Sequence, residues 1–139
     1  MRKTLFASLL VLSISAILSA CGPKPPQEVR ITVTEFSIES SVTTFKVGQP
    51  YHFVVTNEGT IEHELMIAPP LTESEMSMEM HDLDEMALAM IPEEDLQAGA
   101  TAALDFTFEE VASAGELEFA CHIPGHYEAG MKLPIVVER

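Results

Sequence analysis

The chain has 139 residues, of which 22 are acidic and 7 are basic, and its formal net charge is −15. This excess of negative charge argues against binding to nucleic acid and against electrostatic attraction to an anionic lipid surface. It favours partner proteins with basic docking surfaces. A chain of this length holds one small domain.

The N-terminal segment has the pattern of a secretory signal. Arg2 and Lys3 give a positive start, and residues 5–18 form an apolar run interrupted only by Ser, which is too short for a stable membrane span. The run ends at residues 18–22, Leu-Ser-Ala-Cys-Gly, which resemble a bacterial lipobox. The resemblance implies that residues 1–20 are a lipoprotein signal peptide and that Cys21 carries lipid. The alternative is an ordinary signal peptide that leaves Cys21 as a free thiol.

A short proline-rich tether, residues 21–28, follows the expected cleavage site. We expect it to be extended and semi-rigid, spanning roughly 20 Å at about 3 Å per residue, and to hold a domain at 29–139 away from the lipid surface. Lipid on the sulfur and on the new amine gives durable anchoring. We therefore expect an exported protein anchored to a bacterial membrane, facing the periplasm or the cell exterior. Loss of Arg2 and Lys3 with the signal leaves 5 basic and 22 acidic side chains.

Apolar residues that alternate with polar ones predict short strands over most of the remaining chain. Several of the strands end at turn signals, such as Gly48-Gln49-Pro50 and Pro69-Pro70. The expected strands are residues 29–34, 42–47, 51–56, 62–68, 102–108, 115–121 and 133–137. Short strands with turns between them predict an all-β domain, a Greek-key sandwich of two antiparallel sheets.

One insertion, around residues 73–91, departs from this alternation. Five of its apolar residues follow one another at intervals of four and three: Met76, Met80, Leu83, Ala87 and Met90. This spacing is typical of one face of an α-helix. We therefore expect one short acidic amphipathic helix over part of the insertion, ending before Pro92, with its apolar stripe against one sheet.

The stretch from Cys121 to Met131 carries the strongest chemical signal. It places a thiolate, an imidazole and a thioether five residues apart, at Cys121, His126 and Met131. Soft sulfur beside imidazole favours copper, and one Cys with two His and a weak axial Met is the ligand set of blue-copper sites. The second imidazole has to come from another segment, and His63, at the start of an expected strand, is well placed to supply it.

The Cys-x4-His-x4-Met spacing resembles that of the cupredoxins, in particular the auracyanin-like and rusticyanin-like members, and the resemblance covers roughly residues 29–138. It implies one type 1 copper per chain with three equatorial ligands and one axial Met: His63, Cys121, His126 and Met131. Glu64 is a departure, because several cupredoxins have Asn or Ser directly after the first His, where it helps to tie the two ligand loops together. A carboxylate near a copper thiolate favours Cu(II).

The insertion also contains five Met and one His that are soft metal ligands: Met76, Met78, Met80, His81, Met86 and Met90. Thioethers suit Cu(I), so the segment could form a second site that captures or passes on this ion. Met also fills irregular gaps in protein cores, and packing is the interpretation we prefer for this stripe. His122 directly follows Cys121 and should point away from the copper, either along a path for electrons or, as we prefer, towards solvent.

The sequence contains no nucleophile–base set and no Gly-rich phosphate loop, and a blue-copper ligand set leaves no strong position vacant for a substrate. We expect no enzyme and no small-molecule substrate. We expect instead a carrier of single electrons between a donor and an acceptor protein, with His126 as the exit that the resemblance implies. The alternatives are a copper chaperone or buffering protein that uses the Met-rich segment, and, more weakly, a sensor or accessory subunit of a redox complex. Lipid on Cys21 and metal on Cys121 leave no pair for a disulfide.

Overall fold

The structure is a computed structural model that describes residues 24–139. The expected signal peptide and the expected lipidation site, Cys21, lie outside the described residues. Residues 24–26 of the expected tether are exposed and lead into the first strand, which begins at Gln27, within the expected tether. Within residues 24–139, no helix combines the length and the apolar character that crossing a lipid bilayer requires.

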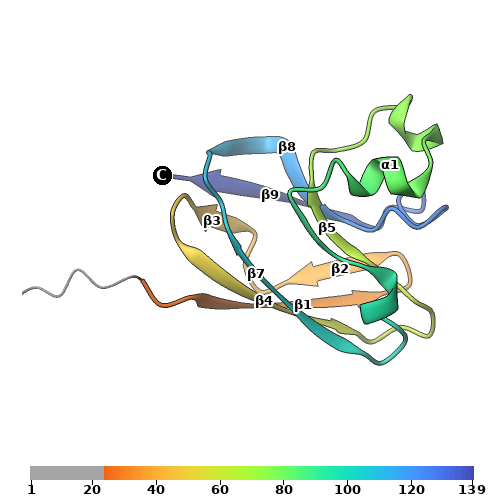
Figure 1. Cartoon of the computed structure of the whole chain (residues 1–139), viewed down its shortest axis with the longest axis horizontal. Helices are drawn as coiled ribbons and strands as arrows, with labels where there is room; N and C mark the ends of the chain where they lie inside the picture. The colour runs from red at the N-terminus through yellow and green to blue at the C-terminus, as the bar shows by residue number, and fades with distance from the viewer. Residues whose placement is uncertain (1–23) are drawn as a thin grey trace, which may run out of the picture.

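Two sheets pack face to face, which confirms the predicted two-sheet β-sandwich (Figure 1). The first sheet has the order β2 (Ser37–Ser40), β1 (Gln27–Thr34), β4 (Pro50–Asn57) and β7 (Thr101–Thr107). The second has the order β3 (Thr44–Lys46), β9 (Lys132–Glu138), β8 (Ala112–Ala120), β5 (Leu65–Ala68) and β6 (Ala89–Ile91). Cys121 directly follows the end of β8, in the second sheet.

The pairing within the sheets is mixed, which corrects the expectation of wholly antiparallel sheets. β1 and β4 run parallel, with Gln27 opposite Tyr51, and β3 and β9 run parallel, with Thr44 opposite Val136. The other strand pairs are antiparallel. Alternation in the sequence reports the two faces of a strand and carries no information on the direction of its neighbour.

An aromatic cluster fills the space between the sheets. Phe45 packs edge-on against Tyr51 and Phe119, with ring centroids 5.0 and 5.8 Å apart, and Phe119 also packs against Phe53 at 5.7 Å. Aromatic pairs at such separations contribute about 0.5–1.5 kcal/mol beyond the burial of their area. Phe119 lies two residues before Cys121, so the core fixes the end of β8 from which this thiol projects.

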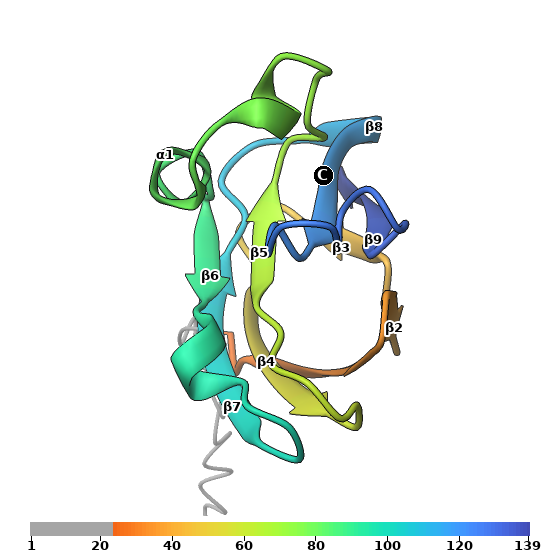
Figure 2. The same ribbon diagram turned by 90° about the vertical axis from the view of Figure 1, so that its right-hand side faces the viewer.

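In the structure the insertion comprises the whole segment between β5 and β7. It forms the predicted short helix over only a few residues. It contains a 3-10 turn, η1 (Glu75–Ser77), then α1 (Met80–Asp84), then β6, and a second 3-10 turn, η2 (Glu93–Asp95). β6 extends the second sheet by pairing with β5, so Met90 lies opposite Met66 in a strand and not on a helix (Figure 2). A helix as short as α1 is marginally stable on its own in water. The residues that follow it form backbone hydrogen bonds with the open edge of β5 instead of continuing the helix.

Candidate metal site

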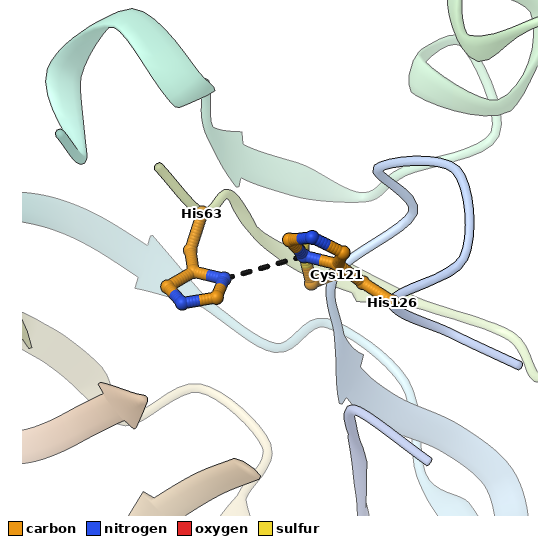
Figure 3. Close-up of side chains that lie close together, drawn as sticks. All are labelled: His63, Cys121 and His126. Atoms are coloured by element: carbon orange, nitrogen blue, oxygen red, sulfur yellow. Dashed lines mark hydrogen bonds between the residues drawn. The ribbon is translucent and has the colours of Figure 1, made fainter. Parts of the chain in front are cut away.

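Two loops bring one thiol and two imidazoles together (Figure 3). His63 lies between β4 and β5, Cys121 directly follows β8, and His126 lies in the loop between β8 and β9. The Nδ1 atoms of His63 and His126 are 3.3 Å apart, and Cys121 Sγ is 3.3 Å from His126 Nδ1. The three ligand atoms lie within 4.8 Å of one another.

This arrangement fits one metal ion. Bonds of about 2.0–2.3 Å to imidazole nitrogen and thiolate sulfur place three ligands in a trigonal plane roughly 3.5 Å apart, close to the separations found between these atoms. His63 and Cys121 are fully buried and His126 is 8% exposed. A buried set of one thiolate and two imidazoles is the trigonal set that selects copper, so these residues fit the predicted single copper.

Met131 lies at the other end of the same loop and is fully buried. The N–H of Cys121 donates to the carbonyl of Met131 at 3.2 Å, and the N–H of Met131 donates to the carbonyl of His126 at 3.0 Å. Gly125, with φ of 89°, adopts the left-handed conformation that tightens the turn before His126. The backbone therefore closes the loop and pairs Met131, the residue expected as the axial ligand, with Cys121.

Asn57 organises the loop that carries His63. Its Nδ2 donates to the carbonyls of Ile61 and Leu96, at 2.7 and 2.8 Å, and its Oδ1 accepts from the N–H of Gly59 at 2.8 Å. The N–H of His63 donates to the same Leu96 carbonyl at 3.3 Å. The Asn-x-Gly pattern in the sequence could have indicated this role, because an Asn side chain commonly stabilises a turn by bonding the backbone two residues further on.

Glu64 joins the two ligand loops directly. Its Oε1 accepts a hydrogen bond from the N–H of His122 at 2.6 Å, and its side chain is fully buried. Burial raises the pKa of Glu64 to about 7, against the effect of this hydrogen bond. The carboxyl therefore makes the kind of connection that the cupredoxin resemblance assigns to Asn or Ser at this position.

Burial shifts the pKa of all three ligands, against metal binding at the thiol and in its favour at the two imidazoles. Burial raises the pKa of the Cys121 thiol to about 12, although the N–H groups of Glu64 and Ile123 oppose this by donating to the sulfur. A metal ion that binds here therefore has to displace a proton from the thiol. Burial lowers the pKa of His63 and of His126, so both imidazoles are neutral and have a lone pair to offer.

His126 is the ligand nearest the surface, and Phe36 packs against it. The two rings meet edge-on with centroids 5.3 Å apart. Phe36 is 46% exposed and has φ of 63°, a left-handed conformation that is unusual for a bulky residue. The turn between β1 and β2 thus holds an aromatic side chain over the one ligand of the three that reaches the surface.

The residues of the Met-rich segment are dispersed. Met76 and Met78 are each 39% exposed, Met80 is half-buried, and His81 is exposed with Nε2 3.7 Å from Glu85. Met86 and Met90 are half-buried, and Met90 belongs to β6. The stripe therefore does not form one buried helical face.

The expectation that His122 faces solvent is wrong. The residue is only 4% exposed. It is one of the residues, together with Met76 and Leu71 of the insertion, that line a common cavity. The insertion folds back over the end of β8. A local sequence pattern around His122 cannot predict this burial, because the residues that cover it lie 40 or 50 positions away in the chain.

Comparison with known proteins identifies relatives of this chain. It is 32% identical over 115 residues to the copper-resistant cuproprotein CopI of Rubrivivax gelatinosus, covering 82% of this chain and 68% of that protein. It is 26% identical over 180 aligned positions to CopI of Pseudomonas aeruginosa, covering 99% and 98%. No family model matches the chain.

Solved structures with the same fold include an auracyanin and a rusticyanin. Auracyanin B aligns with a TM-score of 0.63 at 18% identity, covering 85% of this chain and 93% of that one. Rusticyanin from Thiobacillus ferrooxidans aligns with a TM-score of 0.54 at 15% identity, covering 82% and 79%. These alignments confirm the cupredoxin fold, and the buried His-Cys-His group lies within that fold.

Proposed function

The chain belongs to the family of the copper-resistant cuproproteins CopI, and from this premise we propose that it is a type 1 copper protein that carries single electrons outside the cytoplasm. The observation that carries the proposal is the buried group of His63, Cys121 and His126, whose ligand atoms lie within 4.8 Å of one another. Met131 is the proposed axial ligand. Copper held there supplies one-electron chemistry by alternating between Cu(I) and Cu(II).

The protein's own contribution is to fix the ligands before the metal arrives. The Asn57 side chain donates two hydrogen bonds and accepts a third, which set the loop of His63, and Glu64 ties this loop to the backbone that follows Cys121. Because these ligands cannot move apart, the ligand geometry is nearly the same in both oxidation states of the metal. Little reorganisation then accompanies each electron transfer, which favours an electron carrier over an enzyme, and we propose no catalytic activity or small-molecule substrate.

Electrons leave and enter at His126 in this proposal, because it is the only one of the three ligands with measurable exposure. The redox partners are a donor and an acceptor protein. The chain carries 22 acidic and 7 basic residues, so we expect basic docking surfaces on these partners, with association that weakens as salt increases.

The proposed location is the outer face of a bacterial membrane, with a lipid on Cys21 as the anchor. The sequence supports it through the signal-like residues 1–20 and the lipobox-like residues 18–22. Cys21→Ala should leave either an unprocessed precursor or a soluble exported domain, with no lipid attached. A metabolic lipid label that still enters the variant would contradict the anchor.

A second candidate function is copper handling, in which the protein buffers the ion or delivers it. The relatives favour it, because their names refer to copper resistance, and so does the exposure of Met76 and Met78. A role in copper tolerance is compatible with both candidates, since either an electron carrier or a copper carrier could serve it.

Visible absorption combined with copper retention separates the two candidates. An electron carrier loaded with Cu(II) should show an intense band near roughly 600 nm, as expected of a thiolate-ligated site. After reduction with ascorbate it should keep its copper against a Cu(I) chelator of moderate affinity and recover its band on reoxidation. Absence of the band, or prompt loss of copper to the chelator from the reduced protein, would favour copper delivery.

Met131→Leu is a matched variant for this experiment. It removes only the weak axial contact, so the copper should stay bound, the band should persist and the reduction potential should rise. Complete loss of copper from this variant would show that Met131 is a principal ligand or that the loop is not built as proposed.

A further inference from the structure

A groove of about 590 Å³ lies at the start of β8, next to the end of β7. Its lining includes Phe106 of β7, the buried Phe108 of the connection between the strands, and Leu117 of β8. Figure 1 shows this connection at the end of the sandwich where the chain terminates, whereas Cys121 follows the other end of β8. The volume lies within the range of about 300–1,000 Å³ that is usual for binding sites.

The two most exposed large apolar side chains of residues 24–139 both line this groove. Leu88, directly before β6, is 53% exposed, and Val111, directly before β8, is 52% exposed. Single exposed apolar side chains are ordinary, but apolar surface that gathers in one concave region marks a site of interaction. Together with Phe106 and Leu117, these residues give the groove an apolar lining that the domain by itself leaves in contact with water.

The same groove carries negative charge. Glu109, Glu110 and Glu116 line it, and no Lys or Arg is among the described residues that do so. Glu109 and Glu110 are exposed and take part in no ion pair within residues 24–139. The sequence between Lys46 and Lys132 contains no Lys or Arg at all. The groove therefore attracts a basic ligand and disfavours a second copy of this acidic chain.

β7 presents an unpaired edge beside the groove. It is the last strand of the first sheet, and in the described chain only β4 pairs with it. A strand at the edge of a sheet offers a row of N–H and C=O groups to another extended segment. Phe106 and Thr107, at the end of β7, also line the groove, so a segment added along this edge reaches it.

We propose that this groove is a docking site for an extended segment of a partner protein in which basic and apolar side chains alternate. The backbone of the segment pairs with the free edge of β7. Its apolar side chains enter the groove against Phe106, Val111 and Leu117, and its long basic side chains reach the exposed carboxylates of Glu109 and Glu110. In this mode of recognition, main-chain hydrogen bonds give affinity and pockets for alternate side chains give specificity.

The docking site is separate from the copper ligands. None of His63, Cys121, His126 and Met131 lines the groove. A bound segment therefore leaves His126 free to meet a redox protein, so one partner can hold the carrier while another exchanges electrons with it. The inference goes beyond the proposed electron-carrier function and does not depend on it.

A synthetic peptide of alternating Lys and Val, as long as the seven residues of β7 and blocked at both ends, serves as the probe. Two control peptides have Ser in place of Val, or Glu in place of Lys. A fluorescent label on each peptide reports its affinity for the full copper-loaded protein. We expect the Lys-Val peptide to bind roughly tenfold more tightly than the Lys-Ser peptide, because its apolar side chains are buried, and the Glu-Val peptide not to bind.

Amide signals locate the bound peptide. In the diamagnetic Cu(I)-loaded protein labelled with ¹⁵N, addition of the Lys-Val peptide should shift the signals of residues 101–112, which comprise β7 and the connection to β8. The signal of His126 should stay in place, because the copper site lies at the other end of β8.

A matched pair of double variants separates the groove from the rest of the acidic surface. Glu109→Gln with Glu110→Gln should weaken binding of the Lys-Val peptide severalfold. Glu39→Gln with Glu58→Gln removes the same amount of charge at exposed positions outside the groove and should leave the affinity nearly unchanged. A general attraction between the peptide and the net charge would affect both pairs alike.

A second matched pair tests the apolar contacts. Val111→Ser should weaken binding of the Lys-Val peptide and have little effect on the Lys-Ser peptide. Ile61→Ser changes an apolar residue that is 40% exposed and lies outside the groove, and it should affect neither. Both side chains are exposed, so the variants should fold, and the absorption band near roughly 600 nm shows whether the copper site is intact.

Several results would overturn the docking site. They are equal affinity for the Lys-Val and Lys-Ser peptides, equal weakening by the two pairs of Glu substitutions, and amide shifts centred on the loop of His126. A dimer in sedimentation that Val111→Ser dissociates would also overturn it, because a second copy would then be the occupant. A protein that shows no band but still distinguishes the peptides and the variants would contradict the copper proposal and support the docking site.

Discussion

The copper loop and the insertion both offer sulfur and imidazole, but they do so in opposite ways. At the copper loop an ionisable thiol, Cys121, and two imidazoles are enclosed between two loops and fixed by hydrogen bonds before any metal binds. In the insertion the sulfurs are uncharged thioethers, two of them 39% exposed, on a short segment that contains only a 3-10 turn and a five-residue helix. Enclosure suits an ion that stays bound while it changes charge, whereas the insertion leaves two of its Met residues partly exposed to solvent.

Of the substitutions that distinguish the copper loop from the insertion, Cys121→Ser should have the largest effect on copper binding. The substitution removes the soft anionic ligand and with it the charge-transfer band, while the sandwich should still fold because its core consists of strand residues. Absorption and copper content of the loaded variant measure the effect. A variant that keeps the full band would show that the ligand assignment is wrong.

Two Met substitutions compare how tightly the sandwich and the insertion are packed. Met66→Ala empties a fully buried position in β5, and such deletions cost about 2–5 kcal/mol of unfolding free energy. Met78→Ala alters a side chain that is 39% exposed and should cost under about 1 kcal/mol. Denaturant unfolding of the two copper-free variants gives the comparison. Similar losses in both would mean that the insertion is as tightly packed as the sheet.

Asn57→Ala should loosen the loop of His63. The variant leaves the carbonyls of Ile61 and Leu96 without their Nδ2 donor and the N–H of Gly59 without its acceptor. We expect a loss of about 2–3 kcal/mol in unfolding free energy, because each buried group left unsatisfied costs on the order of 1 kcal/mol or more. Copper affinity should fall as well. Unchanged affinity at reduced stability would mean that the loop keeps its shape without the Asn.

A smaller effect concerns the pH dependence of stability at Glu118. Burial raises the pKa of this carboxyl above 4.5, although Tyr127 donates to its Oε1 at 2.5 Å. The folded protein then retains a proton that the unfolded chain has lost, so its stability falls as the pH rises from 4.5 through the raised pKa. Glu118→Gln keeps an acceptor for Tyr127 and removes this decline.

Unfolding of the copper-free protein at pH 5 and at pH 8 measures the difference between parent and variant. The raised pKa of Glu64 contributes a decline of the same sign in both proteins, so the difference between them isolates Glu118. An identical fall in the two proteins would show that Glu118 does not contribute.

The sequence predicts most of the sandwich and the metal-binding triad for physical reasons. Alternation with a period of two records which face of a strand is buried, and strands such as β4 follow it residue by residue. Cys121 and His126 are separated by one short loop, so their spacing almost determines their distance. His63 follows because a second imidazole was required and this residue stands at the start of an expected strand.

What the sequence does not predict depends on distant segments. The parallel pairing of β1 with β4 is a property of the assembled sheet. β6 forms because β5 offers an open edge, which overrides the helical spacing that ends at Met90. His122 is buried because the Met-rich run folds over it. Sequence spacing alone could not place Met76 and Met78 in the lining of the cavity that His122 also lines.

The central claim is that the enclosed site keeps one copper through a one-electron cycle. An anaerobic redox titration of the copper-loaded protein, followed at the band near roughly 600 nm, tests it most directly. The account predicts a single reversible one-electron transition, with one copper per chain still bound after repeated cycles. A band that disappears on reduction and does not return, with copper found free in solution, would contradict it.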